Sequence, residues 1–122
     1  MFEITIKDTT YQFNFGIGFV REIDKTMQRP VDGMPEIKEN IGLSIKIGQI
    51  IGRDVIALVD VLELANKGKE PRVTTQILED YIDDPSTDID KLFEDVIDFF
   101  RNANATKHIT AQMESALAMI EE

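Results

Sequence analysis

The chain has 122 residues, contains no cysteine and carries a formal net charge of −10. This length predicts a single domain, residues 1–122, that buries a hydrophobic core without cross-links. The absence of cysteine excludes disulfides and thiolate metal sites. The acidic excess, concentrated in residues 62–122, argues against nucleic acid as a partner, because phosphates are bound by clustered Lys and Arg. No apolar run approaches the roughly 20 residues of a membrane span and no signal peptide is visible, so we expect a cytoplasmic protein without a membrane partner.

An antiparallel β-hairpin is predicted for residues 2–15. Apolar and polar residues alternate in FEITI and again in YQFNF, which is the period of strands with one buried face. Placing both apolar sets on that face predicts three facing pairs: Ile6 with Tyr11, Ile4 with Phe13, and Phe2 with Phe15. The connection, residues 7–10, contains no glycine, which favours a four-residue loop over a two-residue type I′ turn. Because an isolated hairpin is marginal in water, it is expected to pack on helices.

The next segment predicts a helix that enters through Gly16 and Gly18 and ends before Pro30. Its apolar residues at helical spacing are Phe19, Val20, Ile23 and Met27. Residues 31–35 are predicted to form a loop. Residues 36–51 fit either a helix or a strand that alternates through Leu43, Ile45 and Ile47. The helix is favoured, although the glycines at 42, 48 and 52 each cost it about 1 kcal/mol relative to alanine.

Four further helices are predicted in the second half. The first, residues 54–67, has a broad apolar face that suits a central position and stops near Gly68. A short helix follows, capped by Thr74 or Thr75. Ser86 or Thr87 is expected to cap the next, and the last runs to the C-terminus. The predicted fold class is therefore α+β, mostly α, with an N-terminal hairpin packed on four to six helices.

No catalytic, cofactor or metal site is evident among the motifs. Gly16-Ile17-Gly18 lies where a dinucleotide fingerprint would lie, but Arg21 occupies the position of its third glycine. The acidic stretch that begins at Asp84 has Ile89 where a calcium loop requires glycine. His108 is the single histidine and has no second histidine or cysteine to share a zinc ion. We expect a non-enzymatic protein without a cofactor.

Four residues are candidates for binding a partner: Phe99, Met113, Leu117 and Ile120. On one helix Phe99 points about 100° away from Phe100, so it either anchors a partner from outside the buried stripe or joins a broad core face. The other three candidates belong to one apolar stripe of the last helix. That stripe packs either on the core or on another chain.

The order, length and charge of these segments resemble the small tail assembly chaperones of long-tailed phages and prophages. The resemblance is carried by the hairpin FEITIKDTTYQFNF, the helix entry GIGFVREIDK, and three later segments, IGLSIKIGQIIG, GRDVIALVDVLELA and DIDKLFEDVIDFF. It implies a non-enzymatic protein that binds and solubilises the tape-measure protein, helps to recruit tail-tube subunits and is absent from the mature virion. Because some members of the family self-assemble, the resemblance also implies possible self-association.

Two other interpretations remain open at this point. The chain would suit a structural component of a tail or connector, in which case it would stay in the mature particle. It would also suit a small prophage-encoded regulatory protein that acts on a basic host target, given its acidic charge.

Overall fold

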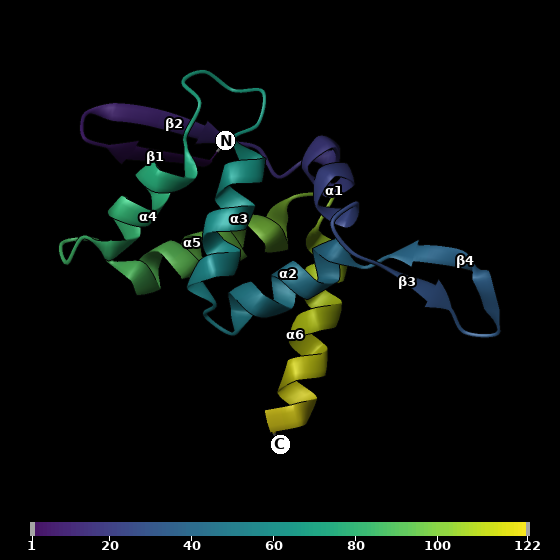
Figure 1. Ribbon diagram of the computed structural model, residues 1–122. Coiled ribbons are helices and arrows are strands. Elements are labelled where there is room, and N and C mark those ends of the chain that lie inside the picture. The colour runs from purple at the N-terminus through teal and green to yellow at the C-terminus, as the bar shows by residue number, and fades with distance from the viewer. Residues whose placement is uncertain (1, 122) are drawn as a thin grey trace.

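The computed structural model describes residues 2–121, which form two antiparallel hairpins and six α-helices (Figure 1). This arrangement confirms the predicted fold class. In chain order the elements are β1 (Phe2–Ile6), β2 (Thr9–Phe13), α1 (Ile17–Asp24), β3 (Gln28–Val31), β4 (Met34–Asn40), α2 (Gly42–Ile51), α3 (Val55–Ala65), α4 (Thr75–Asp83), α5 (Ile89–Asn102) and α6 (Lys107–Glu121).

The β1–β2 hairpin forms as predicted, but its register is displaced by two residues. Phe2 pairs with Phe13 and Ile4 with Tyr11, instead of the predicted Phe15 and Phe13. The connection is the two-residue turn Lys7-Asp8, with φ values of 48° and 68°, as a type I′ turn requires. A shift of two residues keeps every side chain on its own face, so the apolar pattern could not distinguish the two registers. With the shorter turn, Ile6 pairs with Thr9 instead of the predicted Tyr11.

The chain leaves the sheet directly after Phe13 and meets the end of α3. The N–H of Asn14 donates to the carbonyl oxygen of Ala65 at 2.8 Å. Phe15 is buried beyond the strand, and its ring still contacts Phe2, with 6.0 Å between the centroids. The predicted contact between these two residues therefore exists without the predicted strand pairing.

The segment between α1 and α2 differs most from the prediction. Helix α1 ends at Asp24, so Met27 lies outside it, and the predicted loop and the start of the favoured helix form the β3–β4 hairpin instead. Helix α2 begins only at Gly42. Nearly every residue of β3 and β4 is exposed, so neither strand shows the alternation that identifies a half-buried strand. The hairpin projects away from the helices (Figure 1).

Of the two N-caps that were predicted for the later helices, one is confirmed and one is wrong, and α3 begins next to Asp54 as expected. Asp54 caps α3 and Thr74 caps α4 through side-chain oxygens that accept backbone N–H groups. Helix α5 is capped by Asp88, so the prediction of Ser86 or Thr87 was wrong. The Thr87 hydroxyl is engaged elsewhere, because it donates to the carbonyl oxygen of Tyr81 at 2.6 Å.

The core lies where the β1–β2 hairpin and helices α1, α2, α3 and α5 meet. One face of the hairpin and the α5 stripe of Leu92, Phe93, Val96, Ile97 and Phe100 are buried. Six phenylalanines join the two through ring contacts: Phe2, Phe13, Phe15, Phe19, Phe99 and Phe100. These contacts fix the hairpin on the C-terminal half of α5.

Helix α2 starts in direct contact with the end of α1. The N–H of Leu43 donates to the Asp24 carboxylate at 2.8 Å, a favourable position for a negative charge at a helix N-terminus. A Cβ on Gly42 would lie 2.0 Å from the carbonyl oxygen of Ile23. Only glycine permits this approach of the two helices.

Candidate interaction surfaces

Helix α6 begins against the core and ends away from it (Figure 1). Ile109 and Met113 pack on the core, and the Met113 methyl lies against Gly48 of α2, 3.1 Å from where a Cβ would be. Leu117 is half-buried, whereas Met119 and Ile120 are 76% and 78% exposed. The apolar stripe of α6 therefore changes along its length from a core contact to a free apolar surface.

Polar contacts fix the first half of α6 to α5. The hydroxyls of Thr106 and Thr110, both fully buried, donate to the carbonyl oxygen of Phe100 at 2.8 and 3.2 Å. The Arg101 guanidinium donates to both carboxylate oxygens of Glu114, with its shortest contact at 2.8 Å. This pairing lowers the pKa of Glu114 and raises the pKa of Arg101.

Acidification should weaken this attachment of α6. The hydrogen bond from Arg101 holds the pKa of Glu114 below its ordinary value of 4.5. The stabilisation is therefore complete above the unfolded-state pKa and is lost as the pH falls through the lower folded-state pKa. We expect Glu114→Gln to reduce the free energy of unfolding near neutral pH by at most about 1 kcal/mol, because the pair is partly exposed.

Chemical denaturation from about pH 6 to about pH 3 measures this effect. The difference between the wild type and Glu114→Gln should shrink towards the acid end of the range. Glu36→Gln, at an exposed position on β4, serves as the control and should show no such trend. A difference for Glu114→Gln that stays constant across the range would contradict the assignment.

Phe99 occupies the edge of the aromatic cluster. Its ring packs against Phe2 in an edge-to-face arrangement, with 5.0 Å between the centroids, and 37% of the residue is exposed. Phe100 is buried. The structure thus lies between the two alternatives for Phe99, since one side of the ring contacts the hairpin and the other reaches solvent.

The four candidate residues do not form one surface. Met113, Leu117 and Ile120 follow one another along α6, whereas Phe99 lies on α5 beside Phe2 and Phe15.

A groove between α3 and α4 was missed by the sequence analysis. Its apolar lining is Val55, Ile56, Val59 and Ile82, and its polar lining includes Asp60, Glu79 and Asp83. The broad apolar face of α3 was expected to be mostly buried, yet Val55 is 46% and Ile56 is 71% exposed. The available signal was the surplus of apolar residues at the start of α3, more than one buried stripe needs.

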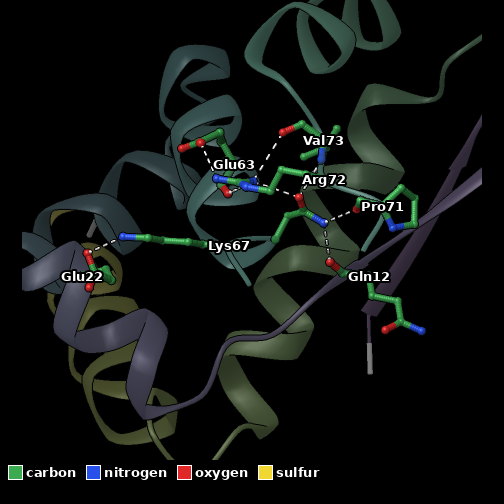
Figure 2. Close-up of polar contacts among 8 residues, drawn as sticks. Gln12, Glu22, Glu63, Lys67, Pro71, Arg72 and Val73 are labelled. Carbon is green, nitrogen blue, oxygen red and sulfur yellow. Dashed lines mark hydrogen bonds and ion pairs between the residues drawn. The ribbon is translucent and has the colours of Figure 1, made fainter. Parts of the chain in front are cut away.

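A buried polar network positions the β1–β2 hairpin against the end of α3 (Figure 2). The side-chain amide of Asn66, fully buried, donates to the carbonyl oxygens of Gln12 at 2.9 Å and Pro71 at 3.3 Å. Its oxygen accepts from the Val73 N–H at 2.6 Å and from the Arg72 guanidinium at 2.8 Å. One side chain therefore joins β2, α3 and the loop that leads to α4.

Two ion pairs lie close to this network (Figure 2). Arg72 also binds the Glu63 carboxylate at 2.6 Å, and Lys67 binds Glu22 of α1 at 3.1 Å. The Lys67 ammonium group lowers the pKa of Glu22. These pairs link α3 to the loop that follows it and to α1.

Within residues 2–121, no helix has both the length and the apolar character needed to cross a bilayer.

The comparisons with known proteins agree with the resemblance. A family model described as phage tail assembly chaperone protein, TAC, matches residues 3–114. No curated protein and no solved structure matches the chain. The matched range contains both hairpins except Phe2, helices α1 to α5 and the core-packed half of α6. The chain therefore belongs to the phage tail assembly chaperone family.

Proposed function

We propose that this chaperone binds the tape-measure protein of its own phage and keeps it soluble in the host cytoplasm until the tail assembles. The observation that carries the proposal is the family match over residues 3–114. Exposed apolar side chains on helices offer contacts for a helical client. The net charge of −10 favours the solubility of the complex.

The free end of α6 is the proposed contact for the client. Ile120 is largely exposed and Leu117 is half-buried, so both can lose surface to a partner. Phe99 offers a separate aromatic contact beside the hairpin, and Met113 supports the helix through its packing on α2. The tail-tube protein and a second copy of the chain are further partners in this proposal.

Co-expression with the tape-measure protein from the same genome tests the proposal. We expect the tape-measure protein to become soluble and to co-purify with the chaperone. Ile120→Ser should reduce the captured amount, because it removes apolar surface from the contact. Ile17→Ser, at an isoleucine that is 65% exposed on α1, is the matched control and should capture as much as the wild type.

Failure to solubilise or capture the tape-measure protein would overturn the proposed function. Mass spectrometry of purified virions provides the second test, and the chaperone should be absent from them. Its presence in stoichiometric amounts would favour a structural component of the tail or connector instead.

A further inference from the structure

The α3–α4 groove is a surface that the fold leaves open. Each of the two helices contributes four lining residues: Val55, Ile56, Val59 and Asp60 from α3, and Thr75, Glu79, Ile82 and Asp83 from α4. Helices α3 and α4 contact each other, and residues of both helices line the groove. Ile56 exposes 71% of its surface there, which is unfavourable in water for a side chain with no other role. A helix that covered the groove would bury this surface.

The carboxylates of the groove define the charge of what can cover it. Glu79 and Asp83 are one helical turn apart on α4, and within residues 2–121 neither forms a salt bridge. Asp60 lies on the opposite wall and is paired with Lys46 at 3.2 Å. Two carboxylates beside an apolar lining are complementary to an apolar stripe with Lys or Arg next to it.

The shape of the groove favours a helix over an extended peptide. Both walls are helices, whose backbone groups are already hydrogen-bonded within each helix. An extended peptide would find no strand edge to pair with, whereas a helix satisfies its own backbone and can pack its side chains between two others.

A second copy of this chain is a poor occupant. Within this chain, the exposed apolar end of α6 is the segment that most resembles an apolar helical stripe with Lys or Arg next to it. However, the two basic residues of that helix, Lys107 and His108, lie in its first turn, and Glu114 lies nearer to the exposed end. Docking that end would bring carboxylates towards Glu79 and Asp83.

We propose that the α3–α4 groove binds a helical segment of another protein that carries an apolar stripe flanked by Lys or Arg. The assignment of that segment to the tape-measure protein rests on the proposed function. The chemistry of the groove does not depend on that assignment, so the two can be tested separately.

The first test uses the full chain and a designed, fluorescein-labelled helical peptide of about 18 residues, or about five turns. The peptide has Leu at i, i+3, i+4 and i+7 and Lys on both flanks, and a counterpart has Glu in place of every Lys. Fluorescence anisotropy at about 0.15 M salt, where surface charges are screened beyond about 8 Å, should show saturable binding of the Lys peptide and none of the Glu peptide.

Matched variants locate the binding. Glu79→Lys/Asp83→Lys should weaken binding at least about tenfold by reversing the local charge. Glu3→Lys/Glu36→Lys changes the net charge equally at two exposed strand positions and should leave the affinity within about threefold. Ile56→Ser should also weaken binding, whereas Ile17→Ser should not. Thermal unfolding checks that each variant remains folded.

Equal loss of affinity in the two charge-reversal variants would overturn the proposal, because the attraction would then depend on net charge alone. Failure of the wild type to bind the Lys peptide would overturn it as well. Capture of the tape-measure protein by the wild type measures the proposed function independently. If capture succeeds while the peptide fails to bind, the proposed function stands and the groove assignment falls.

Discussion

Replacing Gly42 with alanine should lower the free energy of unfolding by about 3 kcal/mol or more, at the upper end of the cost of overpacking. The added Cβ would lie 2.0 Å from the carbonyl oxygen of Ile23 and 2.8 Å from its carbonyl carbon. These are backbone atoms, so no side chain can rotate to relieve the overlap. Helices α1 and α2 would have to separate, and the hydrogen bond from Leu43 to Asp24 would be strained with them.

Gly18→Ala is the matched control for this substitution. Gly18 also lies near the start of a helix, and a Cβ there would meet nothing within 4 Å. Alanine should therefore stabilise the protein at this position, by roughly 0.5–1 kcal/mol, through its higher helix propensity. Urea denaturation of both variants measures the contrast. If alanine changed the free energy of unfolding by a similar amount and in the same direction at Gly18 and Gly42, the close approach of α1 and α2 would not require glycine at position 42.

Replacing Asn66 with alanine should lower the free energy of unfolding by about 3 kcal/mol, because buried polar groups lose their partners. The carbonyl oxygen of Gln12 loses the Asn66 amide as a donor, and the Val73 N–H loses its acceptor. The site is fully buried, so water cannot replace these bonds without opening the structure. The loss of stability should be largest where the β1–β2 hairpin contacts the end of α3.

Hydrogen exchange and urea denaturation together check this expectation. Asn104→Ala is the control, since Asn104 is exposed in the α5–α6 turn, and it should change stability by less than about 0.5 kcal/mol. Amide protons of β1 and β2 should exchange faster in Asn66→Ala than in the control. If Asn66→Ala is as stable as Asn104→Ala, the network does not hold the hairpin in place.

The elements that bury one face could be predicted from the sequence. Alternation in residues 2–15 identified the first hairpin, and the stripe from Leu92 to Phe100 identified α5, because burial imposes a period on the apolar residues. The hairpin register could not be predicted, since registers that differ by two residues bury the same side chains. Asp8 in the left-handed conformation allowed the tighter turn without glycine.

The sequence signal for the second hairpin was its turn, but the helical spacing of nearby isoleucines favoured a helix instead. Asp32-Gly33 is a common two-residue hairpin turn, and Gly33 has φ of +80°. Isoleucines at 37, 41 and 45 also fit a helical stripe, although Ile37 is exposed in the structure. A strand that is exposed on both faces lacks the periodicity on which such predictions depend.

The candidate surfaces were only partly accessible to sequence reasoning. The stripe of α6 was identified, but its division into a packed half and a free half depends on the contact between α6 and α2, which no local pattern specifies. The α3–α4 groove depends on the placement of α4 beside Val55 and Ile56, which no local pattern specifies. Asn66 gave no signal, because a buried asparagine and an exposed one look alike in a sequence.

The exposure of the β3–β4 hairpin has a practical consequence. Nearly all of its residues are exposed, and its tip, Asp32-Gly33, stands away from the helices (Figure 1). An epitope tag or a small fluorescent label inserted at this tip would leave the core packing untouched, because insertions are best tolerated at exposed loop tips. The hairpin thus provides an internal attachment point for following the protein during tail assembly, with the C-terminal end of α6 left free of any fusion.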